Sequence, residues 1–203
     1  CGSPTDINHE DTCKGAARRW IQRHEQIKYA FKNALSCISD LELELEPAID
    51  PLASLRADFS ILLGGCRTYY DIQVVAINAE SAKETAQETL ARAAAAKRLK
   101  YASLGPYFQP LIFSAGGLLE KDSAQAYKAL QHLIGPVGAF QLDTTIGLTL
   151  SRTRAQSAAS IAVRPARGLE TSQFRQRYQQ RPTFTSNLSP IQSQEASSSI
   201  ATN

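Results

Sequence analysis

Two apolar runs joined by a Gly-Gly turn, each with one aspartate, constrain this chain more than any other feature. The stretch LRADFSILLGGCRTYYDIQVVA spans residues 55–76, and its β-branched and aromatic residues are typical of strands. A carboxylate in the body of a strand is costly unless it is paired or binds a metal ion. Asp58 and Asp71 occupy matching places in the two runs, so a hairpin would bring them close together. Two such carboxylates can hold a divalent cation.

The segments around the hairpin predict a fold of mixed helices and strands. Apolar periodicity and strong helix formers indicate helices, and alternating or β-rich runs indicate strands. Helices are expected at 16–38, 80–104 and 118–134, and further strands at 41–46 and 107–115. Pro110 in the last strand indicates a sheet edge or a bulge. This order gives an α/β (α+β) fold, with a mixed sheet of about four strands flanked by helices.

The chain has the length of one domain with appendages. Its 203 residues are 43% hydrophobic, which is enough for a core. No apolar run is long enough to cross a membrane, so no membrane partner is expected. The sequence has no methionine and starts at a cysteine, which indicates a piece of a longer polypeptide. We expect a truncated zinc knuckle at 1–15, the main domain at 16–136, a helical extension at 137–163 and a disordered basic, Ser- and Gln-rich tail at 164–203.

Three soft metal ligands lie in the first fifteen residues. Cys1, His9 and Cys13 are separated by seven and three residues, whereas a structural zinc site needs four ligands. A cysteine three positions before Cys1 would complete a Cys-x2-Cys-x7-His-x3-Cys knuckle. Zn²⁺ is therefore a candidate ligand of the full-length parent. The alternative is a polar loop that happens to contain these residues.

Two lysines follow the hairpin on the next predicted helix. The apolar stripe of this helix runs through Leu90 and reaches Lys97 and Tyr101, so Lys97 falls on the side that faces the sheet, and Lys100 lies one turn further along. Two carboxylates and a lysine suit metal-assisted phosphodiester hydrolysis. The alternative is a lysine at a helix end whose stem covers apolar surface while its ammonium stays in water.

Taken in order, these features resemble a known family. The chain is similar to the C-terminal part of non-LTR retrotransposon polyproteins, in which a restriction-endonuclease-like domain follows the reverse transcriptase. The resemblance covers about residues 1–134. Its motifs are the knuckle of Cys1, His9 and Cys13, the pair Arg23-His24, the strand start Arg56-Ala57-Asp58, the strand Asp71-x-x-Val74 and the helical Lys97-x-x-Lys100-Tyr101.

The resemblance implies a restriction-endonuclease-like fold and a DNA endonuclease that nicks target DNA to prime reverse transcription in the nucleus. It implies Mg²⁺ or Mn²⁺ as cofactor and element RNA as a further partner, bound through the parent polypeptide. It assigns metal binding to Asp58 and Asp71 and catalytic roles to these aspartates together with Lys97, Lys100 and Tyr101. It assigns DNA contacts to Arg23, His24 and Arg56. The oligomeric state does not follow from it.

The sequence departs from the family at two positions. Ala57 stands where the family has proline, and Gln73 stands where restriction-type nucleases often have lysine. Two alternatives therefore stay open. The first is a nucleic-acid-binding remnant of the same fold that has lost catalysis, and the second is an unrelated α/β interaction domain whose aspartates lie on the surface.

Overall fold

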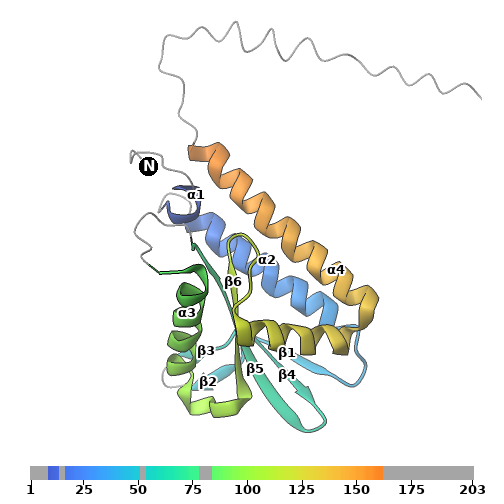
Figure 1. Cartoon of the computed structure of the whole chain (residues 1–203). Coiled ribbons are helices and arrows are strands. Elements are labelled where there is room, and N and C mark those ends of the chain that lie inside the picture. Colours follow the sequence, from blue (N-terminus) through green and yellow to red (C-terminus); the bar gives the residue numbers. More distant parts are fainter. Residues whose placement is uncertain (1–8, 14–16, 51–53, 78–83, 162–203) are drawn as a thin grey trace, which may run out of the picture. The chain divides into compact units, whose positions relative to one another are not determined.

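The computed structural model describes residues 9–13, 17–50, 54–77 and 84–161, and it combines helices with one four-stranded sheet and a two-stranded one (Figure 1). The expected class of mixed helices and strands is confirmed. Cys1 and the tail expected at 164–203 lie outside the described residues. The elements in chain order are α1 (His9–Thr12), α2 (Ala17–Leu35), β1 (Glu42–Leu45), β2 (Ala48–Asp50), β3 (Leu55–Arg56), β4 (Phe59–Leu63), β5 (Cys66–Val75), α3 (Ala86–Lys100), the 3₁₀-helix η2 (Ala102–Tyr107), β6 (Phe108–Ser114) and α4 (Lys121–Ile161).

The main sheet is mixed, as the sequence predicts. Its strand order is β1-β4-β5-β6, with β1 and β5 antiparallel to β4 and with β6 parallel to β5. The parallel pair is joined through α3, since parallel neighbours need a crossover connection. Pro110 lies in β6 at the edge of this sheet, where its missing N–H costs no ladder hydrogen bond.

The first apolar run of the hairpin, residues 55–63, does not form one continuous strand but is interrupted between β3 and β4. The backbone N–H of Ala57 donates to the carbonyl of Pro47 at 3.3 Å, whereas that of Asp58 donates to the carbonyl of Tyr70 at 3.0 Å. The chain therefore changes partners between these two residues. Its first part, β3, pairs with β2 in a separate two-stranded sheet.

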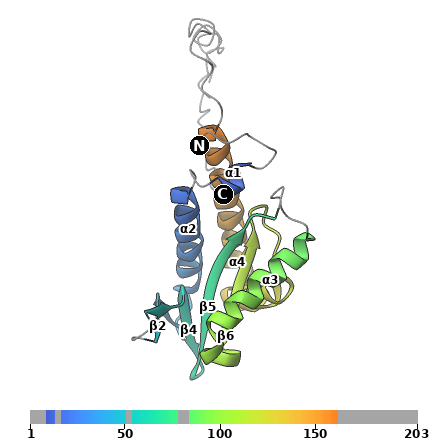
Figure 2. The ribbon, with the colours of Figure 1, turned by 90° about the vertical axis from the view of Figure 1, so that its left-hand side faces the viewer.

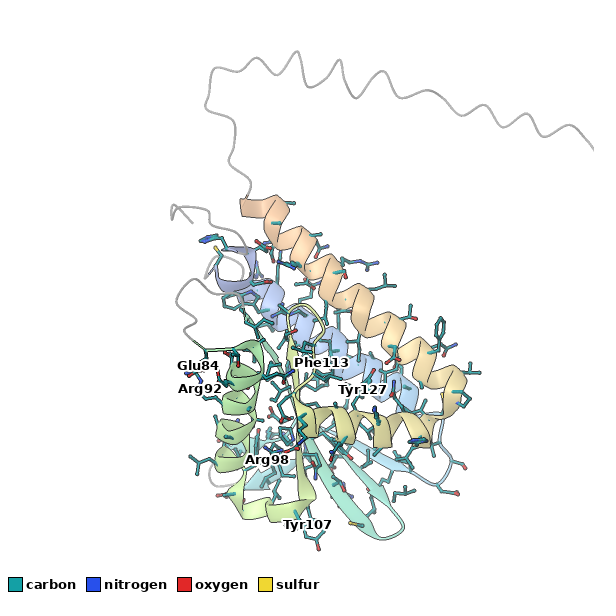
Figure 3. All side chains as sticks on the ribbon, viewed as in Figure 1. Glu84, Arg92, Arg98, Tyr107, Phe113 and Tyr127 are labelled. Atoms are coloured by element: carbon teal, nitrogen blue, oxygen red, sulfur yellow. The ribbon has the colours of Figure 1, made fainter. Side chains whose placement is uncertain are left out.

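One face of the main sheet packs against α2 and α4, which lie side by side (Figures 1 and 2). Ile27, Phe31 and Leu35 of α2 are fully buried in this core, and their spacing confirms the helix expected at 16–38. Phe113 of β6 meets Tyr127 of α4 with ring centroids 6.0 Å apart (Figure 3), an edge-to-face geometry that aromatic pairs favour.

Helix α4 contains a sharp bend at Gly135, where φ is 80° and ψ is 168°. A positive φ of this size suits glycine, and Pro136 follows it, as expected for the end of a helix at 134. A second helical stretch continues to Ile161 and contributes Leu142, Ile146 and Leu150 to the same core as α2. The boundary expected at 136 thus falls at the bend, and both halves of α4 pack on one core.

The opposite face of the sheet is covered by α3. Leu90 and Ala94 are fully buried against Ile112 of β6, which fixes the side of α3 that faces the sheet. The helix begins after the N-cap Thr85, whose side chain forms a reciprocal capping box with Glu88. Its expected start at 80 lies outside the described residues, and η2 replaces its expected last turn. None of the described helices is long and apolar enough to span a membrane.

Candidate active site

The two aspartates of the hairpin lie where the β4–β5 ladder ends. Phe59 pairs with Tyr70, and the N–H of Asp58 donates to the carbonyl of the same Tyr70 at 3.0 Å, so the ladder is irregular at Asp58. The backbone N–H of Ile72 donates to Oδ2 of Asp58 at 2.5 Å. Strand β4 begins only at Phe59, so the Asp58 side chain, rather than a backbone carbonyl of β4, accepts the hydrogen bond from Ile72. This bond brings Asp58 next to the residue that follows Asp71 in β5.

Asp71 is buried between a hydroxyl and an ammonium group. It is 5% exposed, its Oδ1 accepts a hydrogen bond from the hydroxyl of Tyr101 at 2.5 Å, and its Oδ2 is in close contact with Nζ of Lys97. Oδ2 has no hydrogen bond of good geometry among the described residues. The Lys97 ammonium therefore acts on the Asp71 carboxylate mainly as a nearby opposite charge. A surface location of Asp71, as in an unrelated interaction domain, does not agree with this burial.

Tyr101 connects the acidic pair to strand β3. Its hydroxyl oxygen lies 2.6 Å from the carbonyl oxygen of Arg56 and 3.0 Å from Nζ of Lys100. The single hydroxyl proton serves either Asp71 or the Arg56 carbonyl, while the lysine donates to the hydroxyl oxygen. Burial, and then the hydrogen bond to Asp71, raise the pKa of Tyr101 above its usual value, so the hydroxyl remains a donor.

His24 of α2 reaches the other aspartate. Its Nε2 lies 3.0 Å from Oδ2 of Asp58, and its Nδ1 lies 3.5 Å from the carboxylate of Glu25. The hydrogen bond to Asp58 raises the pKa of His24 above its ordinary value, and partial burial opposes this effect. The sequence predicted a DNA contact for His24 and missed its carboxylate partner, because no spacing relates a helix residue to one 34 positions away.

Helix α3 delivers Lys97 as its apolar pattern predicts. Ala94 is buried against the sheet, and Lys97 follows it by three positions on the same side, where its side chain is 21% exposed. Lys100 is different. It is exposed, and its ammonium lies 4.7 Å from the centre of the Tyr101 ring, so its link to the acidic pair runs through Tyr101.

The other predicted residues lie apart from the acidic pair or beyond the described chain. Arg56 is exposed, and its guanidinium donates to the carbonyl of Glu46 at 3.2 Å. Arg23 is 5% exposed, although a DNA contact was expected there. Cys13 is buried near the end of α1. Within the described ranges no three His, Cys, Asp or Glu side chains are grouped closely enough to hold a metal ion by themselves.

The acidic pair has the donor chemistry that a hard divalent cation requires. Mg²⁺ in enzymes is commonly held by one or two carboxylates, with water and substrate oxygens completing its shell. Asp58 and Asp71 supply two carboxylates from neighbouring strands, so a third protein side chain is unnecessary. Oδ2 of Asp71 is already in close contact with the Lys97 ammonium, so a bound cation and the lysine would compete for this oxygen.

A groove of about 340 Å³ lies beside this cluster, and His24 and Lys97 form part of its wall. A larger cavity of about 800 Å³ opens near Tyr70, Arg98 and Asp122. The acidic pair does not line that cavity, whose acid Asp122 is already paired with Arg98 at 2.9 Å. We therefore place the candidate site at the acidic pair and its groove, where the chemistry lies, rather than in the larger space.

Comparison with known proteins adds no family assignment. No protein-family model matches the chain, and no curated protein matches it.

Proposed function

We propose that this chain is a metal-dependent DNA endonuclease domain with a restriction-endonuclease-like fold, part of a non-LTR retrotransposon polyprotein. One observation carries the proposal. Asp58 lies at the end of the β4–β5 ladder, where its carboxylate accepts from the N–H of Ile72, the residue next to Asp71, and the next helix brings Lys97 into contact with Asp71. Two carboxylates and a lysine from three separate elements are the parts that phosphodiester hydrolysis needs.

In this proposal Asp58 and Asp71 hold Mg²⁺ or Mn²⁺, which when bound polarises the phosphate and lowers the pKa of bound water. Tyr101 holds the Asp71 carboxylate through its Oδ1. The ammonium of Lys97 is placed to stabilise negative charge that develops on the phosphate. His24 and the backbone N–H of Ile72 fix the orientation of Asp58, so both carboxylates are positioned before substrate arrives.

The reaction would be a hydrolytic nick in one DNA strand. The oxygen of water bonds to phosphorus, the bond from phosphorus to the 3′ oxygen breaks, and that oxygen takes a proton. The products are a 3′-hydroxyl, which can prime reverse transcription, and a 5′-phosphate. Target DNA in the nucleus and element RNA, bound through the parent polypeptide, are the partners that the family resemblance supports.

A second function has its own support. Both oxygens of Asp71 are already engaged, one by Tyr101 and one by Lys97. A carboxylate so fully paired can serve stability alone, as it would in a nucleic-acid-binding remnant that has lost catalysis. The two functions differ in whether a divalent cation changes what the protein does to DNA.

A nicking assay separates them. The full chain is incubated with supercoiled plasmid and Mg²⁺, alongside the Asp58→Asn, Asp71→Asn and Glu44→Gln variants. Glu44 pairs with Arg67 on the same face of the sheet and is exposed, so it controls for loss of one negative charge. We expect Mg²⁺-dependent nicking that falls at least about a hundredfold in both aspartate variants and less than about twofold in Glu44→Gln. Nicking that survives both aspartate substitutions would rule out this site, and absence of nicking in the folded wild-type chain would favour the binding remnant.

A further inference from the structure

The groove beside the acidic pair has walls from three elements. Trp20, Arg23 and His24 come from α2, Gln73 and Val74 from β5, and Lys97 from α3. Figure 2 shows α2 and α3 on opposite sides of β5, so the groove opens between the two helices along that strand. This arrangement is possible because β4 pairs with β5 only up to Tyr70.

Arg23 is a buried cation without a counterion in contact. It is 5% exposed, and its Nε is a buried donor that has no acceptor among the described residues. Burial lowers the pKa of Arg23, and the more distant charge of Asp11 acts in the opposite direction. Arginine stays protonated in proteins. An unpaired buried guanidinium costs several kcal/mol, on the order of the penalty for removing one partner of a buried ion pair, so this position is poorly explained by stability.

A second unsatisfied donor lies in the same wall. Nε1 of Trp20 is buried and has no acceptor among the described residues, although an indole N–H usually finds one when buried. The other donors of the groove wall, His24 and Lys97, are already paired with Asp58 and Asp71. The donors left over are those of Arg23 and Trp20, which an acceptor-rich, negatively charged ligand would satisfy.

The depth and size of the groove restrict which anion can enter. A duplex presents its phosphates on the outside of a wide cylinder and meets exposed cations first. Arg23 is recessed within a space of about 340 Å³, which suits one nucleotide rather than a helix. Ile21 and Val74 add apolar wall, which favours a ligand that carries a base or sugar together with its phosphate.

We propose that this groove binds a phosphate of an unpaired nucleic-acid strand, with Arg23 as its charged donor and Trp20 as a second donor. The proposal rests on nucleic acid as the substrate proposed above and adds a place for a strand that leaves the duplex beside the acidic pair. Arg23 and Trp20 act here in binding, not in the chemical step.

Trp20 is the single tryptophan of the chain, so its fluorescence reports on the groove directly. The full chain in EDTA is titrated with a short oligothymidylate, with the matching duplex and with inorganic phosphate. We expect the oligothymidylate to change Trp20 emission, the duplex to bind at least fivefold more weakly, and inorganic phosphate to compete only at much higher concentration. Equal binding of the duplex, or equal competition by inorganic phosphate, would overturn the assignment of an unpaired strand.

Variants then locate the phosphate. Arg23→Gln should weaken oligothymidylate binding about tenfold and reduce the dependence of affinity on salt concentration by the amount expected for one lost phosphate contact. Arg18 is exposed on the same helix, and Arg18→Gln should change the affinity less than about twofold. Ile21→Glu is a second test that spares the fold, since Ile21 is 65% exposed at the groove. It should weaken binding at least fivefold, and Asn33→Glu, exposed further along α2, should not.

Binding within twofold of wild type in both Arg23→Gln and Ile21→Glu would overturn the proposal. The titration is carried out without divalent cation, so it does not depend on cleavage. If binding depends on Arg23 but the chain never nicks DNA, the proposed nuclease function fails and the proposed phosphate site stands. Nicking by a chain whose oligonucleotide binding ignores Arg23 would count against the groove alone.

Discussion

Two polar clusters lie on the same side of the β4–β5 hairpin, and they differ in almost every physical respect. In the first, Arg67 pairs with Glu42 at 2.9 Å and with Glu44 at 2.8 Å. Both glutamates are more than half exposed, and all three residues come from strands of one sheet. In the second, Asp71 is buried and its partners Lys97 and Tyr101 come from beyond the sheet.

The comparison shows what separates a candidate site from an ordinary surface ion pair. The exposed cluster is a cross-strand pairing that water screens, and it is worth little to stability. The buried cluster pays for desolvation and orders residues from several elements around one carboxylate. Such a cost is common where a group must be held for chemistry or for binding.

The largest expected difference between the clusters is in stability. Asp71→Ala leaves the Lys97 ammonium without its partner, and it should lower the free energy of unfolding by about 3 kcal/mol. Glu44→Ala in the exposed cluster should lower it by less than about 1 kcal/mol. Urea denaturation of both variants measures this directly. Equal losses would mean that burial does not distinguish the two clusters.

The second largest change in stability is expected when the hydroxyl of Tyr101 is removed. Tyr101→Phe keeps the ring against Phe108, whose centroid lies 4.4 Å away, and removes the hydrogen bond to Asp71. The free energy of unfolding should fall by about 1 to 2 kcal/mol. Tyr107→Phe is the matched control, because Tyr107 is 53% exposed, and its effect should be close to zero. A Tyr101→Phe chain as stable as wild type would show that the hydroxyl contributes nothing to the buried cluster.

The smallest effect is a dependence on pH. The pKa of His24 is raised above its ordinary value of 6.5, chiefly by Asp58, so the folded protein binds the proton more tightly than the unfolded chain. The resulting stabilisation, about 1 kcal/mol, is complete below pH 6.5 and is lost as the pH rises through the raised pKa. The free energy of unfolding should therefore fall with rising pH across this range in the wild type. This pH dependence should disappear in His24→Gln and remain in His132→Gln, where the histidine is exposed. A slope that persists in His24→Gln would assign the titration to another group.

The sequence predicted the parts of the fold that local patterns determine. The spacing of Ile27, Phe31 and Leu35 predicted α2, the Gly64-Gly65 turn predicted the hairpin, and Pro110 predicted an edge strand. The same hairpin led us to expect Asp58 near Asp71, and Asp58 does bond to the N–H of Ile72 beside Asp71, whereas a cation shared by the two carboxylates stays a prediction.

What the sequence did not predict depends on contacts between elements far apart in the chain. The interruption before β4 arises because Ala57 bonds to Pro47 instead of to β5. The bond between His24 and Asp58 depends on how α2 crosses the sheet, which no periodicity determines. The burial of Arg23 is likewise a result of tertiary packing that no local pattern in α2 reveals, so the DNA contact expected there was placed on a recessed side chain.

Metal binding at the acidic pair would show most directly whether Asp58 and Asp71 form a nuclease site. Isothermal titration of the full chain with Mn²⁺ should reveal one site, weakened at least about tenfold in both Asp58→Asn and Asp71→Asn and unchanged in Glu44→Gln. Asp58 and Asp71 would then hold a cation together, as a nuclease requires. Equal Mn²⁺ binding in wild type and in both aspartate variants would contradict the account, and the buried cluster would be a structural ion pair.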